Sequence, residues 1–143
     1  MSTQPLRPAN STTHQPGMPD TWGAENIMSA LEKFNYDTCT YGPLPGTEDW
    51  VSVADLGEGG YDWIEFKAFY SPNARRYFWH GDRGCSCNSW SDELRDATDL
   101  QNGSRADLLR AWETFTKDQG QYSLTVTDYL HGVAEIKKFE PEL

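Results

Sequence analysis

The feature that most constrains the fold is an alternation of side-chain types between residues 62 and 70. From residue 64 onward the even-numbered positions are all apolar, namely Ile64, Phe66, Ala68 and Tyr70. The odd-numbered positions are mixed, namely Trp63, Glu65, Lys67 and Phe69. A period of two in a stretch rich in aromatic residues predicts a β-strand. We expect the first face, which is the drier one, to meet the core.

A second strand is predicted after a turn. Ser71-Pro72-Asn73-Ala74 interrupts the alternation, and residues 75–80 resume it as Arg-Arg-Tyr-Phe-Trp-His. Proline fixes φ at the first central position of a turn and asparagine tolerates left-handed backbone, so this connection predicts a β-hairpin. Residues 50–56 predict a preceding strand, which the glycine-rich residues 57–60 join to the hairpin. Three strands in a meander are the minimum for independent stability.

Three segments have the apolar spacing of an amphipathic helix. Residues 24–34 are one, with a face formed by Ile27, Leu31 and Phe34. Another begins at Ser104 with a capping-box pattern and continues with Leu108, Ala111, Trp112 and Phe115. The last begins at Thr125 and carries the stripe Val126, Tyr129, Leu130, Val133 and Ile136. Together these elements predict one α+β domain over residues 22–143, a three-stranded antiparallel sheet covered by helices.

Residues 1–21 predict a flexible N-terminal arm. The segment is rich in Ser, Thr, Asn and Gln and contains Pro5, Pro8, Pro16 and Pro19. It has few apolar residues to bury, so burial does not offset the entropy lost on ordering. A disordered tail is the simpler interpretation, and an arm that lies along a partner is the alternative.

Length and charge limit the classes of function. The chain has 143 residues, which is enough for one domain and one core. Its net charge of −10 argues against direct binding of nucleic-acid phosphates and against anionic membrane surfaces. No run approaches the roughly 18 to 20 apolar residues of a transmembrane helix. Three cysteines, an odd number, fit a reducing compartment better than a disulfide scaffold.

Two groups of side chains are candidates for a binding surface. The aromatic group could stack on a ligand, although packing within the sheet explains it more simply; it consists of Trp63, Tyr77, Trp79 and Trp90. The acidic group lies in residues 23–60, which hold seven acidic residues and one lysine and include Glu48 and Asp49. Such a segment can attract a basic protein partner, and the alternative is a surface that serves solubility alone.

Cys85, Cys87 and His80 are the candidates for a metal or redox site. Thiolate and imidazole are preferred zinc ligands, but structural zinc sites usually place two to four residues between paired cysteines. The fourth ligand would have to be Cys39 or a carboxylate. We therefore expect free thiols without zinc or another cofactor. No sequence motif pairs either thiol with a base, so no catalytic residue is predicted.

The hairpin and the following loop also carry a resemblance. An aromatic strand, a turn, Arg76-Tyr77-Phe78-Trp79 and then Gly84-Cys85-Ser86-Cys87 resemble a domain of small actinobacteriophage proteins, a family of unknown function. The resemblance covers roughly residues 50–94. It implies a phage origin and the cytoplasm of a bacterial host, and it brings no catalytic residues.

These observations predict a small phage accessory protein that is not an enzyme and that binds a host or viral protein. One alternative is a metal- or redox-bearing domain that uses Cys85 and Cys87. Another is a minor virion component whose N-terminal arm threads along neighbouring subunits.

Overall fold

The computed structural model describes residues 30–118 and 124–141. The predicted arm, residues 1–21, lies outside them, and so does most of the helix predicted over residues 24–34. None of the helices in the described part is long and apolar enough to cross a membrane.

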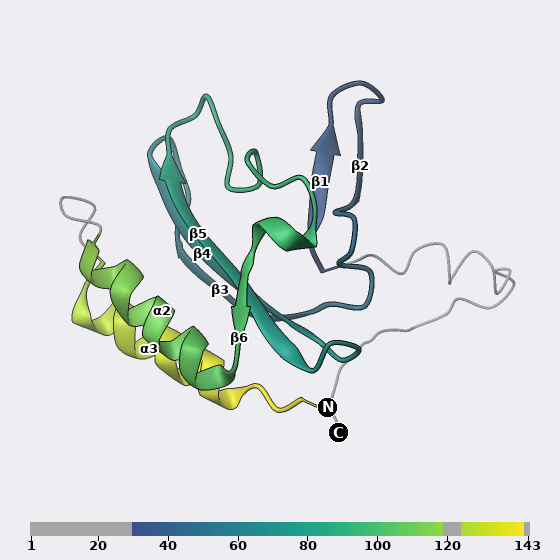
Figure 1. Cartoon of the computed structure of the whole chain (residues 1–143). Helices are drawn as coiled ribbons and strands as arrows, with labels where there is room; N and C mark the ends of the chain where they lie inside the picture. The colour runs from purple at the N-terminus through teal and green to yellow at the C-terminus, as the bar shows by residue number, and fades with distance from the viewer. Residues whose placement is uncertain (1–29, 119–123, 142–143) are drawn as a thin grey trace, which may run out of the picture.

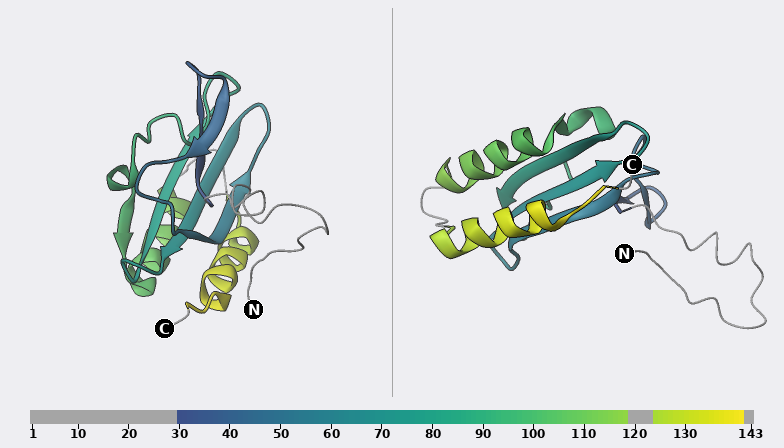
Figure 2. Two further views of the ribbon diagram at one scale, coloured as in Figure 1. Left: turned by 90° about the vertical axis from the view of Figure 1, so that its right-hand side faces the viewer. Right: turned by 90° about the horizontal axis from the view of Figure 1, so that it is seen from below.

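The central element is a four-stranded antiparallel sheet with the order β3-β4-β5-β6. Its strands are β3 (Val51–Glu58), β4 (Trp63–Ser71), β5 (Arg76–Gly84) and β6 (Gln101–Gly103). Helices α2 (Arg105–Asp118) and α3 (Val126–Lys138) run alongside each other across one face (Figures 1 and 2). On the opposite side stands a second sheet, the hairpin of β1 (Glu32–Asn35) and β2 (Thr40–Pro43). The α+β fold class is therefore confirmed, and a two-stranded sheet and the strand β6 are added to the predicted meander.

The face of β4 predicted to meet the core does so. Phe66, Ala68 and Tyr70 are at most 5% exposed and pack in one cluster with α2 and α3. Trp112 of α2 is fully buried in this cluster, with its ring centroid 5.2 Å from that of Phe66. The apolar stripe predicted on α2 is thus confirmed, and α2 and α3 together cover this face of the sheet.

The other face of β4, expected to be the wetter one, is buried as well. Trp63 is 5% exposed and Phe69 is 3% exposed. A second cluster covers them, formed by residues from the β1–β2 hairpin and from the loop after β5: Leu31, Leu44, Trp90, Leu94 and Leu100. The sheet therefore lies between two apolar layers. Trp79 and Trp112 belong to the first cluster, and Trp50, Trp63 and Trp90 belong to the second.

The prediction of a helix over residues 24–34 is wrong where the structure tests it. Residues 32–35 form β1, which pairs in antiparallel register with β2, so that Phe34 lies opposite Tyr41. The side chain of Asn35 accepts hydrogen bonds from the backbone N–H groups of Asp37 (2.8 Å) and Thr38 (3.3 Å), and this stabilises the turn. Leu31, assigned to the helical face, is instead buried in the second cluster.

The burial pattern of β3 and the presence of β6 each have a local explanation. β3 contains a bulge between Ser52 and Ala54, and this explains why Val53 and Leu56, three residues apart, are both buried. β6 has only three residues and exists because it pairs with residues 77–79 of β5. A strand this short leaves no periodic signal in the sequence.

Both predicted helix starts are confirmed. Ser104 and Asp107 bond reciprocally in the form of a capping box at the start of α2, and Thr125 and Asp128 do the same at the start of α3.

The stripe predicted on α3 needs correction. Val126 is 75% exposed and Leu130 is 57% exposed, whereas Gly132 and Ile136 are buried. The buried stripe is therefore centred near Gly132.

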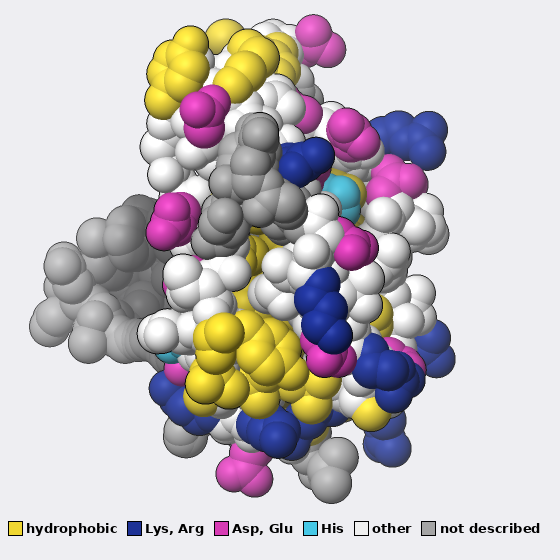
Figure 3. Space-filling view, turned by 90° about the vertical axis from the view of Figure 1, so that its left-hand side faces the viewer, with side chains coloured by type: hydrophobic (Ala, Val, Ile, Leu, Met, Phe, Trp, Pro, Cys, Tyr) yellow, Lys and Arg dark blue, Asp and Glu magenta, His cyan; other side chains and the backbone are white. Residues whose placement is uncertain are grey.

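On the face that carries α2 and α3, hydrophobic side chains gather in the lower part of Figure 3, among Lys and Arg.

Candidate binding groove

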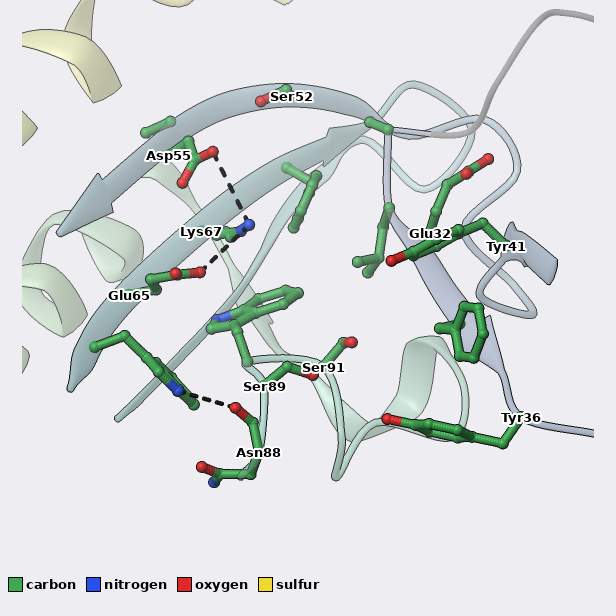
Figure 4. A pocket seen from close by; sticks show the side chains of 17 residues that line it. Glu32, Tyr36, Tyr41, Ser52, Asp55, Glu65, Lys67, Asn88, Ser89 and Ser91 are labelled. Atoms are coloured by element: carbon green, nitrogen blue, oxygen red, sulfur yellow. Dashed lines mark hydrogen bonds and ion pairs between the residues drawn. The ribbon is translucent and has the colours of Figure 1, made fainter. Parts of the chain in front are cut away.

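A groove of about 610 Å³ lies on the side of the sheet opposite the helices (Figure 4). Its floor comes from β4, through Trp63, Glu65, Lys67 and Phe69. The β1–β2 hairpin supplies one wall through Glu32, Phe34, Tyr36 and Tyr41, and the loop of residues 88–91 closes one end. Ser52 and Asp55 of β3 line the side next to the edge of the sheet.

Buried residues at the base of the β1–β2 hairpin fix its position relative to the four-stranded sheet. Leu31 and Leu44 are at most 3% exposed, and the N–H of Leu44 donates to the carbonyl of Leu31 at 3.1 Å. The ammonium of Lys33 donates to the carbonyl oxygens of Asp92 (3.2 Å) and Leu94 (2.5 Å). These contacts fix the hairpin wall against the loop that closes the groove. The groove is therefore pre-formed in the fold.

Aromatic side chains form the rim. Phe34 packs edge-on against Tyr36 and Tyr41, with ring centroids 4.9 and 5.0 Å apart. Tyr36 is 75% exposed and Tyr41 is 69% exposed. Two large and exposed aromatic side chains that pack on one shared phenylalanine beside a hollow are typical of surfaces that contact another molecule.

A cation is held between two acids and an indole on the floor. The Nζ of Lys67 lies 3.5 Å from Oε1 of Glu65 and 4.0 Å from Oδ2 of Asp55. It also lies 5.2 Å from the centre of the Trp90 ring, within range of a cation–π interaction. With Glu32 counted, the described part of the chain places three carboxylates and one ammonium along the groove, and the charge of this lining is negative.

Trp63 and Trp90 are the predicted binding residues that the structure places in the groove. Each is only 5% exposed. The indole N–H of Trp63 donates to the carbonyls of Cys85 (2.8 Å) and Asn88 (3.0 Å), and that of Trp90 donates to the carbonyl of His80 (2.8 Å). Both rings thus anchor the loop after β5 and are covered in the free protein, Trp90 in part by the ammonium of Lys67.

The other predicted binding residues lie elsewhere. Tyr77 and Trp79 are buried in the cluster under the helices, and the indole of Trp79 donates to Oε1 of Gln101 at 2.8 Å. Asp49 accepts hydrogen bonds from the Ser71 hydroxyl (2.8 Å) and the Asn73 N–H (2.9 Å), which ties it to the β4–β5 turn. Glu48 accepts from the N–H of Gly46 at 3.1 Å.

The thiols of Cys85 and Cys87 lie together in the loop after β5. A hydrogen bond from the Cys87 thiol lowers the pKa of Cys85 and raises the pKa of Cys87. Cys85 is partly exposed, and Cys87 is exposed. Within residues 30–118 and 124–141, no three His, Cys, Asp or Glu side chains are arranged to hold a metal ion.

His80 lies on β5 and contacts the same loop through Trp90. Its ring packs edge-on against Trp90, with centroids 5.3 Å apart. Burial lowers the pKa of His80, although the nearby carboxylates of Asp82, Glu93 and Asp99 oppose the shift. Its Nε2 is buried without a hydrogen-bond partner in the described part of the chain and lies 3.9 Å from Oδ2 of Asp82.

Most of the groove was missed at the level of sequence. The lining residues that the sequence did not single out include Tyr36, Tyr41 and Lys67, whereas Glu32 and Asp55 belong to the acidic group of residues 23–60. A signal was present in the run Asn35-Tyr36-Asp37-Thr38, whose turn-forming residues lie between Phe34 and Tyr41. The helical spacing of the preceding residues concealed it.

Comparison with known proteins gives a family but no activity. No curated protein and no solved structure matches the chain. A family model described as a domain of unknown function, DUF7574, matches residues 48–141. This range includes the floor of the groove and the loop that closes it, whereas the β1–β2 hairpin precedes it. Since the match covers well over half of the 143 residues, the chain belongs to the DUF7574 family.

Proposed function

We propose that the protein is a binding module without enzymatic activity and that its groove holds an extended segment of a protein partner. The observation that carries this proposal is the pair of exposed tyrosines, Tyr36 and Tyr41, on the rim of a pre-formed hollow. Tyrosine is enriched at protein interfaces because a rigid aromatic ring provides a large contact area and its hydroxyl can still bond to a partner.

The neighbouring sheet edge favours an extended segment over a compact one. β3 is an edge strand of the four-stranded sheet, and its residues Ser52 and Asp55 line the groove. The outer side of an edge strand offers a row of unpaired backbone groups to another strand. Recognition by strand addition combines such backbone pairing with pockets for alternate side chains.

The resemblance to actinobacteriophage proteins supports a more specific setting. In that setting the chain is a small phage accessory protein that acts in the cytoplasm of the bacterial host on a host or viral partner. The negative charge of the groove favours a basic partner, and direct contact with nucleic acid or with membranes is not part of this proposal.

Capture of partners from infected host cells tests the proposal. The bait is the full chain, compared with the double variant Tyr36→Ala/Tyr41→Ala. The matched control is Tyr61→Ala, which removes an equally exposed tyrosine (76%) that does not line the groove. We expect the double variant to lose a partner that the wild type and Tyr61→Ala retain. Equal recovery with all three baits, at unchanged melting temperatures, would refute the groove as the binding surface.

A second candidate function rests on the paired thiols of Cys85 and Cys87, which suit a redox or metal-bearing role. Its test is elemental analysis of the purified protein and of Cys85→Ser/Cys87→Ser. Near one zinc per wild-type chain, lost in the variant, would support a metal site. If the protein is free of metal and both thiols can be alkylated, the second candidate is rejected and the binding module remains.

A further inference from the structure

Building on the proposed function, we infer that the floor of the groove is a subsite for a cationic side chain of the partner. The partner then presents an arginine or a lysine on an extended segment. In the free protein Lys67 occupies this subsite, so that it acts as an internal competitor of the incoming cation.

The geometry around Lys67 supplies the features that bind a cation. Two carboxylates approach its ammonium from Glu65 on the same strand and from Asp55 on β3, and the ring of Trp90 lies beneath it. The Glu65 side chain is 26% exposed and the Lys67 side chain is 30% exposed. A charge pair with this degree of burial is screened by solvent less than a fully exposed one.

Lys67 is held loosely. Its distances of 3.5 and 4.0 Å to the two carboxylates exceed the roughly 2.7 to 2.9 Å of a charge-assisted hydrogen bond. Lysine is also a point charge on a flexible four-carbon stem, so its ammonium can swing toward solvent without backbone movement. An arginine has a planar guanidinium that can bond to carboxylate oxygens in pairs and can stack on an indole.

The charge of the lining leaves room for a second cation. Glu32, Glu65 and Asp55 face the groove, and among the described residues that line it Lys67 is the one basic side chain. An incoming cation would reduce this excess negative charge. An anionic or neutral segment would gain nothing from it, so charge complementarity selects a basic partner.

The edge of β3 lies beside the proposed cation subsite. Asp55 lies on β3 and is directly paired with Lys67 of β4 in the sheet register. Side chains on one face of a strand recur every second residue. A partner strand added to the free edge of β3 would therefore direct alternate side chains over the groove, next to Asp55.

The inference predicts that removing Lys67 strengthens binding of a basic segment. The probe is the blocked peptide acetyl-Thr-Val-Arg-Val-Thr-amide, and its control has citrulline, which is neutral, in place of arginine. Binding is followed by NMR titration of the indole N–H signals of Trp63 and Trp90. We expect Lys67→Gln to bind the arginine peptide about three-fold or more tightly than the wild type, because a pre-occupied site lowers apparent affinity.

Control variants separate the subsite from general charge. Lys117→Gln on α2 makes the same change in net charge at a side chain that is 71% exposed and far from the groove lining. Lys67→Met, which keeps most of the apolar stem, replaces Lys67→Gln if that variant is poorly folded. Asp55→Asn/Glu65→Gln should abolish the preference for arginine over citrulline.

The outcomes are distinct. Tighter binding in Lys67→Gln, specific to the arginine peptide and absent in Lys117→Gln, supports the inference. Equal binding of the arginine and citrulline peptides, equal effects of the two lysine variants, or no binding of either peptide overturns it. The proposed function would survive any of these results, because it fails only if the Tyr36→Ala/Tyr41→Ala bait recovers its partner normally.

Discussion

His80 shows how a single buried side chain makes stability depend on pH. Burial lowers its pKa below the ordinary value of 6.5, so the folded protein takes up a proton at this position less readily than the unfolded chain does. The unfolded state therefore gains protons first as the pH falls. The free energy of unfolding should be independent of this residue well above 6.5 and should decrease as the pH drops through that value.

Urea unfolding from about pH 8 to about pH 5.5 measures this effect. His80→Phe keeps an aromatic ring against Trp90 and removes the titrating group, so its stability should vary less over the same interval. The carboxylates whose pKa values are lowered, Asp99, Asp107 and Asp128, act in a separate, more acidic range. An identical pH dependence in wild type and His80→Phe would show that His80 is not responsible.

At the scale of elements, the packing of α3 on α2 depends on Gly132. A Cβ at this position would lie 2.3 Å from Nε1 and 2.4 Å from Cε2 of Trp112. The same indole N–H donates to the carbonyl of Tyr129 at 3.0 Å, so the ring cannot shift without loss of that bond. A glycine in the middle of a helix normally lowers its stability, and here the structure gives Gly132 a packing role.

Gly132→Ala should therefore lower the free energy of unfolding by about 1 to 3 kcal/mol through overpacking, although alanine favours helix formation by about 1 kcal/mol. Chemical denaturation measures the change. In a Trp112→Phe background the penalty should shrink, because the ring atoms in conflict are gone. A stabilised Gly132→Ala protein would show that α3 can move away from Trp112 at little cost.

The elements that the sequence predicted correctly are those with a complete local signal. The alternation over residues 62–70, the Pro-Asn turn and the two capping boxes each lie within one segment, and β4, β5, α2 and α3 follow from them. β1 was mistaken for helix because Ile27, Leu31 and Phe34 also fit a helical face. Tertiary contacts of Leu31 with the second cluster favour the strand over the helix, and no local sequence pattern contains these contacts.

The candidate site was harder to predict than the fold for the same reason. The groove joins β1, β2, β3, β4 and the loop after β5, and the residues that line it extend from position 30 to position 91 of the chain. Aromatic content identified Trp63 and Trp90 but could not distinguish a buried anchor from an exposed contact. Exposure of Tyr36 and Tyr41 depends on which side of the hairpin meets the sheet, and this is set only when the layers assemble.

At the scale of the whole molecule, the net charge of −10 should act on the rate of association. If the partner is basic, long-range attraction speeds the encounter, and salt weakens it. The association rate constant should fall as the ionic strength rises from about 0.01 M to about 0.15 M, since the screening length shrinks from about 30 Å to about 8 Å. Stopped-flow mixing with the captured partner measures this rate constant. A rate constant that does not change with salt would show that electrostatic steering does not contribute to association.

Hydrogen exchange of the backbone amides, with and without the captured partner, tests the central claim most directly. If the groove and the edge of β3 hold the partner, added protection should fall on residues 34–41, on β3 and on residues 88–91. The exposed side of α3, with Val126 and Leu130, should be unaffected and serves as the internal reference. Protection confined to α2 and α3, with the groove exchanging as in the free protein, would contradict the account.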